Sequence, residues 1–332
     1  MACAFATAGA QNPHTFEYNK KVANLNDITL SNESTNTEAI TPTEKLEKSV
    51  QYGIENTNFH PDFLSPNFNP KEMRKIVREA ILLAGGGVAI LLQVANPGVG
   101  AGVNEHSNFA YRPLDRLRTT MTYVYCMAYG TPEEKKTIIN MVHRAHAPIK
   151  GAGYTADDID LQLWVAATLY AAGVDIYEKV FGKLDYATSE AVYQQYSVLA
   201  SSLRVPPEMW PKTRKEFWEY WDKMIDTMEI TPHAKNVAND LLHNKESPLW
   251  VRVNLPMVRL FTAEWLPPRM RDAYGLKSTK SHRALYKVYM AIIKTVYPVT
   301  PKFVRHFPLH YYLKDMRKRM KNMDHIIGPD QV

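Results

Sequence analysis

An uncharged stretch of 24 residues constrains this chain more than any other feature. Residues 80–103, AILLAGGGVAILLQVANPGVGAGV, meet the length rule for a membrane-spanning helix. The stretch also contains six glycines, Gln93, Asn96 and Pro97. A lipid-facing helix would leave the backbone groups freed by the proline and the glycines without hydrogen-bond partners. We therefore expect a buried central helix that breaks into a turn, rather than a membrane span.

Helix start signals dominate the chain from Asn69 onward. In NPKEM, Asn69 is placed to cap a helix and Pro70 to occupy its first position. A Thr-Pro pair gives the same signal at Thr131, Thr231 and Thr300. Thr131 is followed three residues later by Glu134, which completes a capping box.

Between these starts the apolar residues keep helical spacing, as in residues 161–169 and 217–225, and no alternating strand pattern occurs. The length of 332 residues and the 45% hydrophobic content suit one large soluble domain. We expect an all-α fold with a single large helical domain over residues 69–321. A polar, partly ordered N-terminal arm over residues 1–68 would precede it, and residues 322–332 would form a tail.

The net charge of +6 is concentrated near the C-terminus, where residues 302–321 contain seven Lys or Arg and one acid, Asp315. Such a helix is either solvated or in peripheral contact with an anionic membrane surface. No nucleic-acid-binding motif accompanies it, so nucleic acid is not an expected partner. Two cysteines and the absence of a secretory signal pattern favour a cytoplasmic protein, and association with a membrane stays open as an alternative.

Two histidines stand three residues apart near the end of the helix that Thr131 starts. On a helical wheel His146 lies inside the apolar arc, between Val142 and Ile139, whereas His143 lies outside it and is expected at the surface. A buried imidazole needs a backbone carbonyl, a side chain or a metal as its partner. The spacing alone is a weak zinc signal, because no HExxH motif accompanies it, and these alternatives stay open.

The preceding helix carries a polar stripe, because Arg116, Thr120 and Tyr123 follow one another at helical spacing. A guanidinium keeps its charge, so a buried Arg116 would bind an anion or an oxygen-rich ligand. Alternatively it pairs with a carboxylate such as Asp115 or Glu105, with Arg118 exposed. Spacing does not decide between the two.

Four blocks then occur in a recognisable order: REAILLAGGGVAILLQVANPGVGAGVNEHSNF at 78–109, RLRTT at 116–120, HAPIKGAGYTADD at 146–158 and EWLPPRMRDAYGL at 264–276. Together they resemble the catalytic domain shared by bacterial rubber oxygenase (latex-clearing protein) and the fungal oxygenase MpaB. The resemblance covers about residues 70–320. It implies an all-helical fold with a buried pocket for haem b, with His146 as the proximal iron ligand and Arg116 and Thr120 in the distal region.

The resemblance also implies an oxygenase that uses O₂ on an apolar small molecule, with an isoprenoid or terpenoid of fungal secondary metabolism as the first expectation. Arg116 would donate hydrogen bonds to oxygen or to a haem propionate, Thr120 would orient oxygen or water, and Tyr154 could bond a propionate. This sequence departs from the family in having Thr119 where rubber oxygenase has a lysine, and Asn96 where the family commonly has a histidine. Oxidative cyclisation, dehydrogenation or rearrangement, and a haemless lipid-binding or scaffold protein, remain alternatives.

Overall fold

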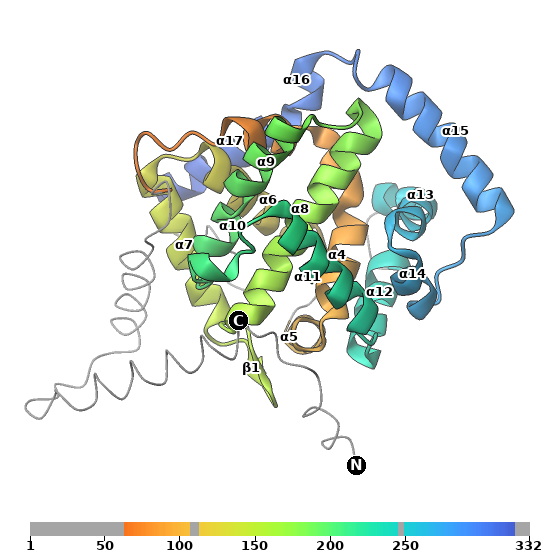
Figure 1. Cartoon of the computed structure of the whole chain (residues 1–332), viewed down its shortest axis with the longest axis horizontal. Coiled ribbons are helices and arrows are strands. Elements are labelled where there is room, and N and C mark those ends of the chain that lie inside the picture. The colour runs from red at the N-terminus through yellow and green to blue at the C-terminus, as the bar shows by residue number, and fades with distance from the viewer. Residues whose placement is uncertain (1–62, 107–112, 245–248, 323–332) are drawn as a thin grey trace, which may run out of the picture. The chain divides into compact units, whose positions relative to one another are not determined.

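The computed structural model describes residues 63–106, 113–244 and 249–322, and these are mostly helical (Figure 1). The expected all-α class is therefore confirmed. Most of the predicted N-terminal arm and tail lies outside the described residues. The only strands in the described ranges are the two-residue β1 (Lys150–Gly151) and β2 (Tyr154–Thr155), which pair antiparallel.

The first half of the described chain contains α3 (Lys71–Val77), the 3₁₀ helix η1 (Ala80–Gly85), α4 (Gly86–Ala95), α5 (Pro97–His106), α6 (Pro113–Tyr129), α7 (Pro132–His146) and α8 (Ile159–Phe181). The second half contains α9 (Tyr186–Tyr196), α10 (Val198–Ser201), η2 (Pro207–Met209), α11 (Arg214–Thr227), α12 (Pro232–Leu242), α13 (Leu249–Trp265), α14 (Pro268–Ala273), α15 (Lys280–Val296), α16 (Lys302–Arg305) and α17 (Phe307–Asn322).

The uncharged stretch forms η1, α4 and α5, with a break at Asn96, so the predicted broken helix is confirmed. Asn96 adopts an extended conformation, and its side-chain oxygen accepts a hydrogen bond from the Gly98 amide at 3.0 Å. Among the described residues, one helix, α8, is long and apolar enough to cross a membrane, and 61% of its most apolar window is buried. The pair formed by α3 and residues 80–95 passes the same test but bends by 68°.

Two of the predicted helix starts are as expected. Thr131 accepts a hydrogen bond from the Glu134 amide and the Glu134 side chain returns one to the Thr131 amide, which completes the capping box. Thr231 caps α12 through the Ala234 amide.

The other two predicted helix starts are wrong by one residue. The first helix begins at Lys71, because the side-chain oxygen of Gln195 accepts hydrogen bonds from the Glu72 and Met73 amides, at 2.8 and 2.9 Å. The Asn69 side chain instead accepts a hydrogen bond from Arg74. Near the C-terminus α16 begins at Lys302, and the Thr300 hydroxyl donates to the carbonyl of Val296.

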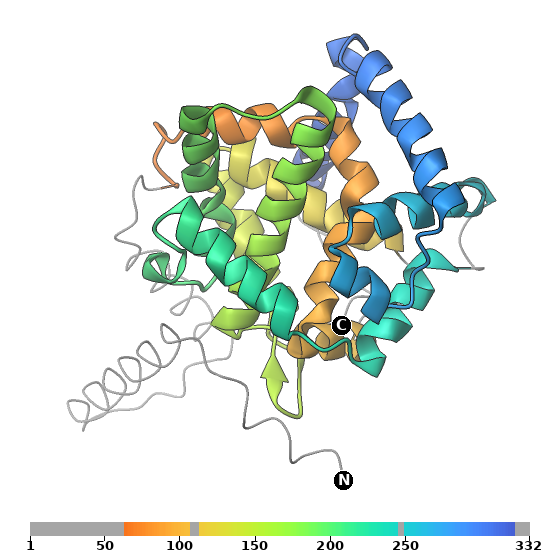
Figure 2. The same ribbon diagram turned by 45° about the vertical axis from the view of Figure 1, so that its right-hand side comes forward.

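Helix α8 lies at the centre of the helical assembly in both ribbon views (Figures 1 and 2). Its Trp164 is fully buried, donates a hydrogen bond to the Leu92 carbonyl of α4 at 2.9 Å and stacks on Trp221 of α11, with ring centroids 5.2 Å apart. Farther along α8, Tyr170 meets Tyr193 and Phe217 edge to face. Buried aromatic pairs thus hold α8 against α9 and α11, and the Trp164 hydrogen bond holds it against α4.

Glycines allow the neighbours of α4 to approach it closely. A Cβ atom at Gly87 would lie 2.2 Å from the Thr262 hydroxyl oxygen of α13, and one at Gly85 would lie 2.0 Å from Ile176 of α8. Both distances are far below van der Waals contact, so only glycine fits without displacement of a neighbour.

We expect Gly87→Ala to lower the free energy of unfolding by about 1–3 kcal/mol, because its methyl group overpacks the contact with Thr262. Gly86→Ala is the matched control, because a Cβ atom there meets nothing within 4 Å and the backbone is already helical. That control should raise the free energy of unfolding by about 0.4–1 kcal/mol. Denaturant titration measures both, and equal effects of the two variants would contradict the close-packing argument.

Candidate functional site

Two largely apolar pockets meet at Arg116. The first, here called the Thr120 pocket, is lined by η1, α4, α6 and α8 and encloses about 790 Å³ of empty space. The second, called the His146 pocket, is lined by α5, the end of α7, the β1–β2 hairpin and the start of α8, and encloses about 700 Å³. Both volumes include open solvent, so they are upper limits on the space that a ligand could occupy.

Arg116 borders both pockets. Desolvation by the surrounding protein lowers the pKa of its guanidinium to about 10, so the group still carries its charge at neutral pH. The two carboxylates considered from the sequence have other partners: Asp115 lies 3.5 Å from Arg118, and Glu105 accepts a hydrogen bond from Tyr154. Arg118, expected to be exposed, is only 27% exposed.

The His146 imidazole borders the pocket that bears its name. It forms no hydrogen bond with any of the described residues. Burial lowers its pKa to about 4, with the nearby Asp157 raising the pKa and the charges of Arg116 and Arg204 lowering it. The imidazole is therefore neutral at physiological pH, which is the form that ligates a metal.

The prediction that His143 lies at the surface is wrong, because only 3% of it is exposed. It continues a buried face of α7 that contains Lys135 and Ile139, spaced four residues apart. The Lys135 ammonium donates to the Phe63 carbonyl at 2.8 Å and lies over the Phe68 ring. A wheel that counts only apolar residues misses this face, because two of its members are polar.

Burial lowers the pKa of His143 to about 3, aided by the charges of Arg204 and His146. Its Nδ1 atom has no hydrogen-bond partner among the described residues. His143 borders neither pocket, whereas His146 borders one of them.

Tyr154 lies on β2 and borders the His146 pocket. Its hydroxyl donates to Glu105 at 2.6 Å, and desolvation together with this bond raises the pKa of Tyr154 to about 12. Its ring meets that of His106 edge to face. The hydroxyl that was considered for a propionate is thus already engaged by a carboxylate.

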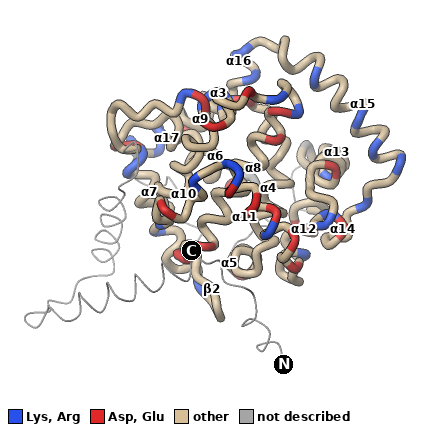
Figure 3. Tube along the Cα trace, viewed as in Figure 1, with Lys and Arg blue, Asp and Glu red and all other residues tan. Residues whose placement is uncertain are grey.

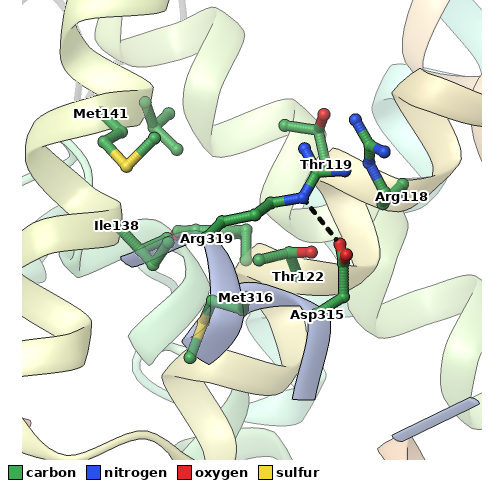
Figure 4. A pocket seen from close by; sticks show the side chains of 10 residues that line it. Arg118, Thr119, Thr122, Ile138, Met141, Asp315, Met316 and Arg319 are labelled. Atoms are coloured by element: carbon green, nitrogen blue, oxygen red, sulfur yellow. Dashed lines mark ion pairs between the residues drawn. The ribbon is translucent and has the colours of Figure 1, made fainter. Parts of the chain in front are cut away.

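Thr119 and Thr120 face different pockets. Thr120 borders the Thr120 pocket. Thr119 donates to the Asp115 carbonyl at 2.9 Å and borders a separate pocket with Arg118, beside Asp315 and Arg319 of α17 (Figure 4). The position that holds a lysine in rubber oxygenase therefore faces neither pocket that Arg116 borders.

Comparison with known proteins decides the family. The sequence profile described as "ER-bound oxygenase mpaB/B'/Rubber oxygenase, catalytic domain" matches residues 73–295. The chain belongs to this family. It is 32% identical over 248 residues to the uncharacterized proteins Mb2261 of Mycobacterium bovis and Rv2237 of Mycobacterium tuberculosis, which covers 72% of this chain and 97% of each relative. No solved structure matches significantly.

The region matched by the oxygenase family includes all four residues singled out from the sequence. The structure places Arg116, His146 and Tyr154 at one pocket and Thr120 at the adjoining one. The chain is thus a member of an oxygenase catalytic-domain family. Its own candidate site residues border two pockets that share Arg116.

Sequence reasoning missed the residues that hold the loop after His146 in this oxygenase domain. Gln162 donates to the Ala156 carbonyl and accepts from the Arg204 amide, both at 2.9 Å, and Arg204 pairs with Asp157 at 2.9 Å. Gln162 is buried and borders the His146 pocket. The only sequence signal was Asp157 within the GAGYTADD block; its partner lies 47 residues away.

We expect the free energy of unfolding to fall as the pH is lowered from about 6.5 toward 4. Both His143 and His146 have folded-state pKa values below the ordinary value of 6.5, so the unfolded chain binds more protons in this interval. Each histidine contributes a slope of up to about 1.4 kcal/mol per pH unit. Stability from this source is complete above pH 6.5 and is lost as the pH falls.

His143→Gln should flatten this slope, measured by denaturant titration across the same pH interval. His282→Gln, at an exposed histidine of α15, controls for the loss of an imidazole as such. A slope in His143→Gln equal to that of the unaltered protein would contradict burial of His143.

Proposed function

We propose that this protein is a haem b-dependent oxygenase that acts on an apolar small molecule, with His146 as the axial iron ligand. One observation carries the proposal: a neutral imidazole without a hydrogen-bond partner in the described residues borders a pocket that meets a second, apolar pocket at a buried cation, Arg116. The family supports oxygenase activity, and the haem and its ligand are our inference.

The residues present fit a haem. One histidine suffices, because the porphyrin supplies four further nitrogen ligands to the iron. Glycines line both pockets: Gly86 borders the Thr120 pocket and has open space where a Cβ atom would stand, whereas Gly98 and Gly102 of the His146 pocket pack against Leu161 and Tyr154. The cationic Arg116 suits the negative charge of a propionate.

Each residue would then have a distinct task. His146 would hold the iron through its neutral imidazole, and the bound haem would supply the iron chemistry that activates O₂. Arg116 would donate charge-assisted hydrogen bonds to a propionate or to oxygen at the junction of the pockets. The Thr120 hydroxyl would orient oxygen or water at the edge of the Thr120 pocket.

The Thr120 pocket is the better candidate for the substrate. Its lining is dominated by aliphatic side chains, among them Leu83, Ile90 and Ile176, and only Gln93, Arg116, Thr120 and Tyr196 offer side-chain polar groups. A lining of this kind favours the binding of a hydrocarbon group over water. We propose an isoprenoid or terpenoid compound, by analogy with the rubber oxygenase named in the family description.

Protein produced with a haem supply should show a Soret absorption band that His146→Ala abolishes or shifts. His106→Ala is the matched control, because His106 is the only other histidine that borders the same pocket within the described residues, and its Nε2 atom lies 3.2 Å from the Lys150 carbonyl oxygen. Loss of the band in His106→Ala but not in His146→Ala would show that His106, and not His146, is the iron ligand. A colourless protein that does not bind added haemin would favour a haemless lipid-binding protein.

Arg116→Gln should weaken haem binding by about tenfold, because removal of one charge-assisted hydrogen bond costs roughly 1.5–3 kcal/mol and water restores part of it. Haemin titration of the apoprotein, followed by absorbance, measures the change. Arg118→Gln on the same helix is the control, since Arg118 borders the separate pocket in Figure 4. Equal losses in the two variants would argue against contact between Arg116 and the haem.

Once haem is established, incubation with isoprenoids under isotopically labelled O₂ separates the reaction types. Label in the product supports oxygenation. Unlabelled dehydrogenated, cyclised or rearranged products would reject it in favour of the other chemistry considered for this scaffold.

A further inference from the structure

Exposed large hydrophobic side chains are concentrated in one part of the described chain. All but Tyr186 lie between Leu249 and Tyr311. Four follow one another along α15 at intervals of three or four residues, and the spacing continues beyond the helix: Leu285, Val288, Ile292, Val296, Val299, Phe303 and Phe307. Val299 is 79% exposed and Phe303 76% exposed, which is unusual for side chains of this kind in a folded domain.

The apolar residues of α15 exceed what its packing requires. The helix rests on α13 through Tyr286, whose hydroxyl accepts a hydrogen bond from Trp265 at 2.9 Å, and through Tyr289, whose ring meets Phe261. Met290 is buried on the same side. The stripe formed by Leu285, Val288, Ile292 and Val296 is separate from these contacts and faces outward. We call this stripe, together with Val299 and Phe303, the α15–α16 surface.

The segment that carries this surface is entirely basic. Residues 273–314 contain no Asp or Glu, and α15 shows only basic residues among its charges in Figure 3. Seven of its Lys and Arg side chains are exposed: Lys277, Lys280, Arg283, Lys287, Lys294, Lys302 and Lys314. Lys280, Lys287, Lys294 and Lys302 form no ion pair with any described residue.

We infer that the α15–α16 surface docks on an anionic lipid bilayer. Apolar side chains that enter the interface and lysines that meet anionic headgroups are the two contributions that hold an interfacial amphipathic helix. A second copy of the chain fits poorly, because a symmetric contact through this surface would bring lysine against lysine with no acid between them.

The C-terminal helix, where the sequence suggested membrane contact, is a weaker candidate. On α17 Arg317 pairs with Glu134 at 2.7 Å and Arg319 with Asp315 at 3.0 Å. Arg305 of α16 is buried and lies 3.6 Å from Glu79. These three arginines are already compensated within the protein. Lys314, Lys318 and Lys321 of α17 are exposed, but the described part of α17 has only Phe307 and Tyr311 as exposed large hydrophobic side chains and lacks the apolar stripe of α15.

This surface is connected to the wall of the Thr120 pocket. The Tyr297 hydroxyl, just after α15, accepts a hydrogen bond from the Ile81 amide of η1 at 3.0 Å. The next two residues of η1, Leu82 and Leu83, border the Thr120 pocket. A protein docked in this way would hold that pocket close to a membrane in which an apolar substrate is dissolved. This link rests on the proposed function; the docking does not.

Co-sedimentation of the full-length protein with vesicles tests the docking without haem or turnover. We expect the protein to pellet with vesicles of phosphatidylcholine and phosphatidylserine, to bind phosphatidylcholine alone more weakly, and to be released by salt. Ile292→Glu/Phe303→Glu should lower the partition coefficient at least tenfold. Tyr186→Glu is the matched control at an exposed aromatic residue outside the surface, and should bind as the unaltered protein does.

Two charge-reversal variants, one on α15 and one on α17, test which helix contacts the vesicles. Lys287→Glu/Lys294→Glu should lower binding to the anionic vesicles about 30-fold or more, and Lys318→Glu/Lys321→Glu on α17 should lower it much less. The reverse order would place the docking on α17 and overturn the inference. Protein that stays in the supernatant also overturns it, and a dimeric mass in that case would assign the surface to a second copy.

Discussion

The close approach of α4 and α5 to their neighbours is the constraint on which the site depends. Gly87 packs against Thr262 of α13, and Gly98 packs against Leu161 of α8. A Cβ atom at either glycine would lie less than 3.0 Å from the neighbouring side chain, at 2.2 Å and 2.8 Å respectively. Because α4 borders one pocket and α5 the other, the same broken helix shapes both. Larger residues would force these helices apart, and the two pockets would no longer meet at Arg116.

Electrostatics then sets the character of the site. The cations Arg116 and Arg204 and the burial of the ring all disfavour protonation of His146, and Asp157, paired with Arg204, only partly opposes them. A neutral imidazole can ligate a metal, and a charged guanidinium beside it can bind an anionic group of the same ligand. The charge on Arg116 is retained because a guanidinium with a pKa of about 10 stays protonated at neutral pH.

Local signals were predictable from the sequence, and contacts over long sequence distances were not. The capping box at Thr131 and the break at Asn96 depend on residues within four positions, so the sequence alone determined them. Gln195, which caps α3, lies more than 120 residues away, and no local pattern reveals it. The burial of His143 was missed for the same reason. His143 shares a helix face with Lys135, and that face is buried because the Lys135 ammonium donates a hydrogen bond to the distant Phe63 carbonyl. Placement of Arg116, Thr120 and His146 needed both the spacing and the family resemblance.

A buried carboxylate connects α16 and the end of α15 to the start of η1. Glu79 is 3% exposed and lies 3.6 Å from Arg305 and 3.2 Å from both His306 and the Tyr297 hydroxyl. Arg78 lies at the same distance, 3.6 Å, from this carboxylate. Loss of Arg305 and His306 would leave Glu79 with less compensation for its buried charge, so these contacts stabilise α16 against the start of η1. η1 also borders the Thr120 pocket, so these contacts connect the α15–α16 surface to the pocket wall. If the inferred docking occurs at that surface, these contacts would bring the pocket wall near the bilayer.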